Sequence, residues 1–538
     1  MPRKALRMML PLLMLVATAL PLAARQSADA VAEGVQRRVE LLRVAGELEI
    51  GGATIRHDPT LAAVYDARLY TPLWTEAAGA ELAQALQALR DDGLDPEHYN
   101  ATAISQLSAM PRTAETAADL ELLRTDAFMR AAYDLRFGKV DRERHQVARD
   151  LARPVVGEDA VAAITELILS GRPRAALAGL RPDHFIYRGL VQALAQLRGV
   201  QAVGGWPVVP AGPTLRLGDE DERVPVLRER LVMGGDLDPE DVVTGNRFDE
   251  ALDAAVRRFQ HRHALNEDGA VGRATLAELN VPVEARIDQV RINLERARWF
   301  THDLPQSFVA ANIAGAKVYM VRDGDVIFET RAVVGTTYRS TPIFTDQMRY
   351  LELNPTWTVP PGIVGDILNN IRRDPNYLRT MNMRVLDRSG RPVDPATIDF
   401  SQYTARTFPY VFRQEPGPLN ALGRIKFMFP NQYNVYLHDT PSRELFARED
   451  RNFSSGCIRV EDPIRLAELI LDEPVRWSRE AIEAAIATGQ TRTIPLATPF
   501  PVLILYWTAS ADLHGEVHYY RDAYQRDASL LAALNRAM

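Results

Sequence analysis

The spacing of apolar residues changes once along this chain, and the change limits the folds that the chain can adopt. Between residues 31 and 197 apolar residues recur at helical spacing, as in "DLELLRTDAFMRAAYDLRFGKV". Beyond residue 305 apolar and polar residues alternate, as in "KVYMVRDGDVIFETRAVVG", where Asp323-Gly324 between two alternating runs is a strong hairpin signal. Because 538 residues exceed what one core accommodates, the sequence predicts a multi-domain α+β protein.

Stretches rich in Gly and Pro divide the chain further. The segment "GVQAVGGWPVVPAGPTLRLGDED" has no long period and suits a linker, and short amphipathic helices follow it. We predict a helical scaffold domain over residues 31–220 completed by 281–304, a small three-helix module over 224–280, a mostly β domain over 305–498 with an insertion over about 366–418, and a C-terminal hairpin and tail over 499–538.

The first residues of the chain have the pattern of an export signal. Arg3, Lys4 and Arg7 precede an uncharged apolar run from Met8 to Ala24. The run also just reaches the length that spans a bilayer, so residues 1–24 are either a signal peptide or an uncleaved membrane anchor. Both interpretations place the rest of the chain outside the cytoplasm, and we expect an exported, periplasmic protein.

The overall charge argues against one class of partner. The chain carries a net charge of -7 at pH 7 and has a sequence pI near 5.9. Binding to a phosphate backbone requires a basic surface, and the composition supplies no basic excess. We therefore expect no nucleic-acid partner.

The chain has a single cysteine, Cys457, which follows His438 by nineteen positions. Structural cysteines of exported proteins occur in pairs, so a lone thiol is free, is linked to another molecule or acts as a nucleophile. An imidazole can take the proton of a thiol and later return it to a leaving amine. Cys457 and His438 are the only Cys and His between residues 306 and 498, and a buried structural thiol is the alternative.

Small residues surround this cysteine in the sequence "SSGCIRV". Ser454, Ser455 and Gly456 precede the thiol and leave room for backbone N–H groups to face a developing oxyanion. The amides of Gly456 and Cys457 are the candidate donors. The pattern is typical of acyl transfer by a cysteine.

The module over residues 224–280 resembles the peptidoglycan-binding module of bacterial cell-wall enzymes. The matching residues are Phe259-Gln260, His263-Ala264-Leu265, Asp268-Gly269, Gly272, Thr275 and Leu279-Asn280. The family commonly has Gly where this chain has Ala264. His261 and His263 are two apart on a helix and point to different faces, so we expect no metal site at these histidines.

The stretch that ends in the cysteine resembles the motif of the L,D-transpeptidase family. The motif reads His438-Asp439-Thr440-Pro441 and then Ser454-Ser455-Gly456-Cys457-Ile458-Arg459-Val460. "LGRIKFMFPN" at 422–431 and "PTWTVPPGI" at 355–363 are similar to the large multi-domain branch of that family, and Ser455 stands where many members have His. The resemblance implies that Cys457 is the nucleophile and His438 the base. It also implies that peptidoglycan stem peptides are joined by 3,3 crosslinks through a thioester, without metal or cofactor.

The same resemblance suggests where a substrate binds. Arg459 could hold a substrate carboxylate, and a structural ion pair is its alternative. Tyr436, Asn431 and Trp357 are the other substrate-binding candidates. The insertion over 366–418 would be a lid over the acyl site, or an inert insertion.

Other functions remain open at this point. An L,D-carboxypeptidase differs only in that water resolves the thioester, and a non-catalytic wall-binding scaffold would use the module alone. A penicillin-binding enzyme is excluded because no lysine has Ser three positions before it. The expected partners are peptidoglycan stem peptides and glycan, with membrane attachment through the N-terminal segment and other cell-wall enzymes as further candidates.

Overall fold

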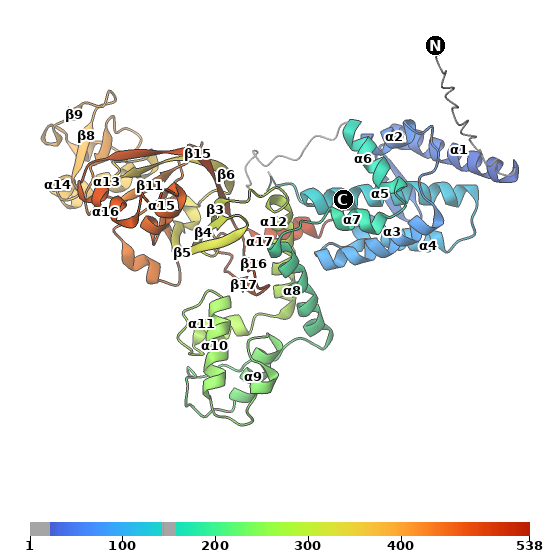
Figure 1. Ribbon diagram of the computed structural model, residues 1–538, viewed down its shortest axis with the longest axis horizontal. Helices are drawn as coiled ribbons and strands as arrows, with labels where there is room; N and C mark the ends of the chain where they lie inside the picture. The colour runs from blue at the N-terminus through green and yellow to red at the C-terminus, as the bar shows by residue number, and fades with distance from the viewer. Residues whose placement is uncertain (1–21, 143, 145–157, 538) are drawn as a thin grey trace, which may run out of the picture. The chain divides into compact units, whose positions relative to one another are not determined.

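The computed structural model describes residues 22–142, 144 and 158–537 of the chain (Figure 1). The predicted signal or anchor, residues 1–24, lies almost entirely outside the described residues. Among the helices in these ranges, none has the length and apolarity needed to cross a membrane. Contacts divide the chain into two compact units, which are described separately below.

The described residues of the first unit form helices and one small antiparallel hairpin. It comprises Met1–Leu89, Asp95–Ala132 and Val155–Leu180. Its elements are α1 (Leu22–Ala45), β1 (Glu47–Ile50), β2 (Ala53–Arg56), α2 (Pro59–Asp66), α3 (Glu76–Ala88), α4 (Ala101–Ser108), α5 (Ala114–Phe137, which runs past the boundary), α6 (Glu158–Leu169) and α7 (Pro173–Gly179). Side-chain oxygens of Asp58 and Thr75 accept hydrogen bonds from the first turns of α2 and α3, which explains why these helices begin there.

The second unit begins its regular structure with five helices. These are α8 (Phe185–Ala202), α9 (Val224–Met233), α10 (Glu250–Arg262), α11 (Arg273–Leu279) and α12 (Val283–Phe300). Helices α9, α10 and α11 are the three short helices that the sequence predicts. They enclose a core of their own that includes Leu227, Leu231, Phe248, Leu252, Val256, Phe259 and Leu279.

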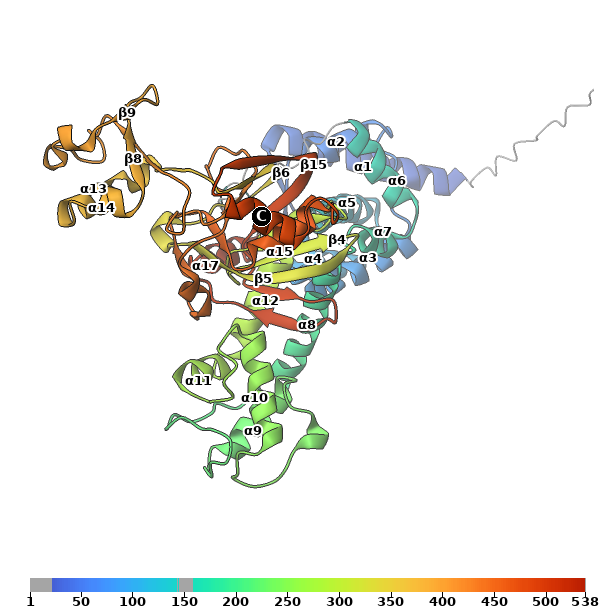
Figure 2. The ribbon, with the colours of Figure 1, turned by 60° about the vertical axis from the view of Figure 1, so that its left-hand side comes forward.

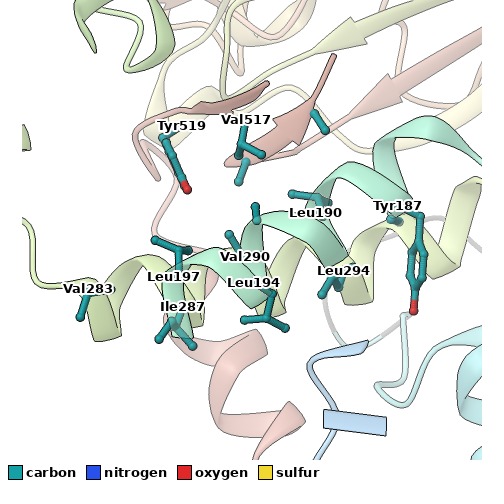
Figure 3. Packing of buried hydrophobic residues seen from close by; sticks show 14 residues of the cluster. Tyr187, Leu190, Leu194, Leu197, Val283, Ile287, Val290, Leu294, Val517 and Tyr519 are labelled. Atoms are coloured by element: carbon teal, nitrogen blue, oxygen red, sulfur yellow. The ribbon is translucent and has the colours of Figure 1, made fainter. Parts of the chain in front are cut away.

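Helices α8 and α12 pack against each other beneath a short hairpin of the C-terminal region (Figure 3). The hairpin consists of β16 (Ala509–Ala511) and β17 (Val517–Tyr519), and the last helix, α17 (Asp527–Leu534), follows it. Leu190, Leu194, Val290 and Leu294 from the helices meet Val517 and Tyr519 from the hairpin in one buried cluster. Burial of this shared apolar surface holds the helices on the hairpin.

The mostly β part forms one nine-stranded sheet with the order β13-β5-β14-β12-β11-β6-β15-β3-β4. Strand β5 also pairs with β4, so the sheet closes on itself, and the two strands lie side by side in Figure 2. The strands are β3 (Phe308–Asn312), β4 (Lys317–Arg322), β5 (Asp325–Gly335), β6 (Phe344–Leu353), β11 (Ile425–Met428), β12 (Leu437–His438), β13 (Asn452–Ser454), β14 (Ile458–Val460) and β15 (Arg492–Leu505). Helices α15 (Pro463–Leu471) and α16 (Arg479–Ala487) precede β15.

The multi-domain α+β prediction is confirmed, and so is the hairpin at Asp323-Gly324. These two residues join β4 and β5 with φ angles of 52° and 89°. Positive φ at both central positions is the geometry of the tight turn that fits twisted antiparallel strands, and Asp-Gly adopts it at low cost.

The predicted insertion is a small subdomain with its own sheet and core, and it begins earlier than residue 366. Its elements are β7 (Trp357–Thr358), α13 (Pro361–Arg373), α14 (Tyr377–Thr380), β8 (Met383–Leu386), β9 (Pro392–Val393) and β10 (Val411–Gln414), and Figure 2 shows most of them gathered in one group. The strands form a separate sheet in the order β7-β10-β8-β9. Ile367, Leu368 and Phe412 are buried within it. We call residues 357–414 the capping insertion.

The C-terminal hairpin starts later than the predicted boundary at residue 499. Strand β15 runs through that boundary and pairs with β3 on one side and β6 on the other. Residues 502–505 are all buried, so both faces of the strand are covered there, which explains the continuous apolar run "VLIL". The hairpin itself is β16 and β17.

Candidate active site

Strands β12 and β14 bring His438 and Cys457 to the same part of the sheet. The two strands are parallel neighbours in which His438 is the register partner of Arg459. Cys457 lies immediately before β14, and the Ile458 N–H donates to the carbonyl of Tyr436 at 3.1 Å. Because side chains alternate along extended chain, Tyr436 and His438 share a face with Cys457 and Arg459.

A row of charged or titratable residues crosses the sheet at this level. Glu352 on β6 pairs with Lys426 on β11, Lys426 pairs with His438, and His438 pairs with Arg459. The Lys426 ammonium lies 3.5 Å from the Glu352 carboxylate and 4.5 Å from the centre of the Tyr436 ring. His438 therefore has cationic residues on both neighbouring strands.

His438 is buried and oriented by its own backbone. Its Nδ1 lies 2.5 Å from the carbonyl oxygen of Asp439, an arrangement in which Nδ1–H donates and Nε2 carries the free lone pair. Burial, and then the positive charge of Arg459, lower the pKa of His438 to about 3. The ring is therefore neutral at pH 7, which is the form that accepts a proton.

Asp439 fixes the backbone segment that orients His438. Its buried carboxylate accepts hydrogen bonds from the backbone N–H and Nε of Arg424, at 3.0 and 2.9 Å, and from Arg443 at 3.1 Å. Gly423 has a φ of 60°, and a Cβ there would lie 2.6 Å from the Asp439 side chain. Asp439 lies within the sequence motif, but no local pattern indicates that it orients His438.

Cys457 is a thiol at rest. Burial raises its pKa, while the backbone N–H and side chain of Tyr436 and the charges of Lys426 and Arg459 oppose that rise. The Sγ atom lies 3.7 Å from the carbonyl oxygen of Asn434. A neutral thiol beside a neutral imidazole fits a base that removes the proton during attack.

One of the two predicted oxyanion donors, the Gly456 N–H, is already hydrogen-bonded within the turn that precedes the cysteine. Gly456 has a φ of 118°, which favours glycine, and its N–H donates to Ser454 Oγ at 3.1 Å. Ser454 Oγ in turn donates to the Cys457 carbonyl at 2.5 Å. The Cys457 N–H donates to no acceptor within the part of the chain that the structure describes, so it is the freer donor.

Arg459 places a cation beside the thiol. Its Nε is buried and has no hydrogen-bond partner, and it forms no ion pair among residues 22–142, 144 and 158–537. Burial lowers its pKa, while Cys457 and then Glu444 raise it. The structural ion pair that was the alternative for Arg459 does not form among these residues.

The other substrate-binding candidates, Tyr436, Trp357 and Asn431, differ in what their side chains contact. The Tyr436 side chain lies beside Cys457 and Trp357, and its ring centre is 5.7 Å from that of His438. The Asn431 amide donates to the carbonyls of Phe429 and Val435 at 2.7 Å each, and its oxygen accepts from two backbone N–H groups. Asn431 therefore braces its own loop and leaves no hydrogen-bonding group for a substrate.

Residues far away in the sequence support the turn at residues 454–457 from outside. The Thr341 hydroxyl donates to the Gly456 carbonyl at 2.9 Å and accepts from the Gly335 N–H at 3.0 Å. The Tyr524 hydroxyl donates to the Gly335 carbonyl at 2.7 Å. No local pattern marks Thr341 or Tyr524, because their role arises only from the packing of distant strands.

The histidines of the module are not arranged around a common centre. His263 is buried, and its ring is stacked on Phe259 at 3.8 Å and on Tyr519 at 5.2 Å between ring centres. His261 faces Glu267, with 2.8 Å between Nδ1 and the carboxylate. A separate group of potential ligands, Asp512, Glu516 and His518, lies on and between β16 and β17.

Comparison with protein families agrees with the division of the chain described above. Residues 306–493 match the model of the L,D-transpeptidase catalytic domain, and residues 220–279 match that of a "Putative peptidoglycan binding domain". Residues 59–194 match a model described as "Scaffold domain".

Individual proteins match over part of the chain. A protein of Haemophilus influenzae described as a "Putative L,D-transpeptidase" is 38% identical over 229 residues, which are 42% of this chain and 46% of that protein. The chain thus spans about half the length of this curated relative.

Solved structures with similar segments include two L,D-transpeptidases. The one from Stackebrandtia nassauensis is 13% identical and covers 56% of this chain and 96% of its own, with a TM-score of 0.23. The one from Xylanimonas cellulosilytica is 14% identical and covers 55% and 98%, with a TM-score of 0.17. The chain contains an L,D-transpeptidase catalytic domain over residues 306–493 together with a peptidoglycan-binding domain over residues 220–279.

Proposed function

We propose that the protein is a peptidoglycan L,D-transpeptidase that forms 3,3 crosslinks through a thioester on Cys457. The observation that carries the proposal is the pairing of β12 with β14, which puts a buried neutral imidazole and the only thiol of the chain on one face of the sheet. The catalytic-domain match over residues 306–493 supports the same reaction class.

The first half-reaction forms the acyl-enzyme. Nε2 of His438 takes the proton of Cys457 as Sγ attacks the carbonyl at the L-centre of diaminopimelate in a tetrapeptide stem. The oxyanion that develops faces the free Cys457 N–H. Collapse breaks the bond to D-Ala, whose amine leaves with the proton from His438, and a thioester remains.

The second half-reaction transfers the acyl group. The side-chain amine of diaminopimelate in a second stem attacks the thioester while His438 accepts a proton from that amine. Collapse breaks the carbon–sulfur bond, and the thiolate recovers its proton from His438. The product is a 3,3 crosslink, and the enzyme returns to its resting state.

The environment of the pair favours proton transfer concerted with attack over a stable ion pair. Burial lowers the pKa of His438 and raises that of Cys457, so both neutral forms are favoured before the substrate binds. Arg459 lies next to both residues and has no carboxylate partner among the described residues, so it suits a stem-peptide carboxylate.

This function requires that the chain reach the cell wall. Residues 1–24 would supply a signal peptide or a membrane anchor, and the periplasm is the compartment that we propose. The peptidoglycan-binding domain over residues 220–279 would hold the same polymer that the catalytic domain modifies, and other cell-wall enzymes could act on it alongside.

The test is incubation of the purified protein with disaccharide-tetrapeptide, followed by mass spectrometry. A dimer that has lost one alanine supports the proposal, whereas tripeptide alone would identify an L,D-carboxypeptidase. Absence of a Cys457 adduct with both substrate and a carbapenem, or full activity in Cys457→Ala, would overturn the mechanism. Binding to peptidoglycan without turnover would instead indicate a non-catalytic scaffold.

A further inference from the structure

Arg339 lies between the capping insertion and residues 454–457, which we call the nucleophile turn, and contacts both. It ends a short helical turn, Thr337–Arg339, that follows β5. Its Nη1 donates to Ser455 Oγ at 3.1 Å and to a carboxylate oxygen of Asp366 at 3.0 Å. Its Nη2 donates to the Gly362 carbonyl at 3.1 Å. One guanidinium therefore joins a residue two positions before Cys457 to helix α13 of the capping insertion.

The base from which the Arg339 side chain extends is held firmly. The Arg339 N–H donates to the Thr336 hydroxyl at 3.2 Å, and the Thr336 N–H donates to the Ser454 carbonyl at 3.0 Å. A Cβ on Gly335 would lie 2.3 Å from the Arg339 carbonyl oxygen, so this loop closes tightly on itself. The loop also carries Thr341, which bonds to the Gly456 carbonyl. The guanidinium is thus positioned by the same segment that supports the nucleophile turn.

The chemistry of the three acceptors suits arginine. A guanidinium is planar, keeps its charge at any pH in the working range, and directs several N–H groups along fixed directions. A hydroxyl oxygen, a carboxylate and a backbone carbonyl can then be held together by one side chain. Lysine would place a single point charge there and could not reproduce the fork.

The ion pair between Arg339 and Asp366 is exposed, so it can open. The Arg339 side chain is 34% exposed and that of Asp366 55% exposed, so solvent screens their ion pair. The capping insertion has its own sheet and core, so it can move as a body when this contact breaks. A substrate that enters beside Ser455 would meet the same guanidinium.

We propose that Arg339 is a positioning residue that couples the capping insertion to the nucleophile turn, so that closure of the insertion and correct placement of Ser455, Gly456 and Cys457 are one event. This inference rests on the proposed function for its catalytic consequence. The physical coupling itself can be measured in the resting protein.

The experiment uses the full chain and three variants that break different contacts. Asp366→Asn weakens the contact with the insertion, Ser455→Ala removes the contact with the turn, and Arg339→Gln removes both. Arg388→Gln, at an exposed position in the same insertion, is the matched control. Thermal unfolding of each variant checks that it is folded.

The first measurement is amide hydrogen exchange of the resting protein. We expect Arg339→Gln to accelerate exchange about tenfold both in α13 and in the peptide that contains residues 454–457. Asp366→Asn should accelerate exchange in the turn, although Asp366 has no hydrogen bond to it. Exchange in the turn that is unchanged in both folded variants would overturn the proposal.

The second measurement is the second-order rate of Cys457 acylation by a carbapenem. Asp366→Asn should slow it about tenfold, the double variant with Ser455→Ala should be no slower than Arg339→Gln, and Arg339→Lys should restore only part of the rate. Additive effects of Asp366→Asn and Ser455→Ala would overturn the coupling. If the unmodified protein is not acylated at all, the proposed function fails, and hydrogen exchange alone still decides the role of Arg339.

Discussion

Replacement of His438 by Asn should remove a measurable acid sensitivity from the protein. Burial holds the pKa of His438 at about 3 in the folded chain, against an ordinary value of 6.5. The unfolded chain therefore binds a proton at this site at pH values where the folded chain does not, and the stabilisation present above pH 6.5 is lost as pH falls. Asn keeps an N–H donor for the Asp439 carbonyl but does not titrate.

The magnitude follows from the distance between the two pKa values. At pH 5 the unfolded imidazole is almost fully protonated and the folded one is still neutral, which costs ~2 kcal/mol of stability. The full difference of the two pKa values corresponds to ~5 kcal/mol, reached near pH 3. The stability difference between His438→Asn and the unmodified protein should therefore shift by ~2 kcal/mol between pH 7.5 and pH 5 in favour of the variant.

The assay is unfolding of both proteins at pH 7.5 and pH 5 under otherwise identical conditions. The two proteins share every other titratable group. The change in their stability difference between pH 7.5 and pH 5 therefore reports on His438. The acylation rate of the unmodified protein by a carbapenem, measured over the same range, should show no loss of base near pH 6.5. Equal acid sensitivity of the two proteins, or an acylation rate that falls below pH 6.5 with an ordinary imidazole pKa, would refute the buried neutral base.

Three further changes test other parts of the molecule. Arg459→Gln should raise KM for the tetrapeptide stem about tenfold while kcat changes less, because a carboxylate contact made before the chemical step is lost; an unchanged KM would exclude that contact. Asp439→Ala should destabilise the second unit by ~1 kcal/mol, as measured by thermal unfolding, because the Arg424 N–H and two half-exposed arginine side chains lose a buried acceptor. Burial raises the pKa of Glu121 to about 7, so its contribution to the stability of the first unit is lost as pH rises from 4.5 through 7. In Glu121→Gln that loss should be absent from unfolding curves recorded at pH 5 and pH 8.

The parts of the site that sequence reasoning found are those with local signals. Cys457 is a single thiol after small residues, His438 ends an alternating run, and Asp323-Gly324 marks a turn by its composition. Each signal lies within a few residues and reflects a backbone requirement or a chemical necessity. The same holds for the three helices of the peptidoglycan-binding domain, whose apolar spacing identifies the buried faces.

The parts that it missed depend on register and on contacts between distant segments. Lys426 adjoins His438, and Glu352 adjoins Lys426, only because β6, β11 and β12 pair in one particular register. The boundary at residue 499 was misplaced because a buried strand and the start of a hairpin have the same apolar composition over a few residues. The engaged amide of Asn431 could not be foreseen either, since its partners are set by the fold of one loop.

The contact between Ser455 and the distant residue Arg339 offers a physical reason for a serine at position 455. A hydroxyl at this position accepts a hydrogen bond from the permanently charged guanidinium of Arg339. A histidine there would lose part of that ability whenever it is protonated, and its charge would then oppose that of Arg339. The serine and the arginine are therefore best understood as one unit, and a change of either residue alters the surroundings of Cys457 without touching the thiol or its base.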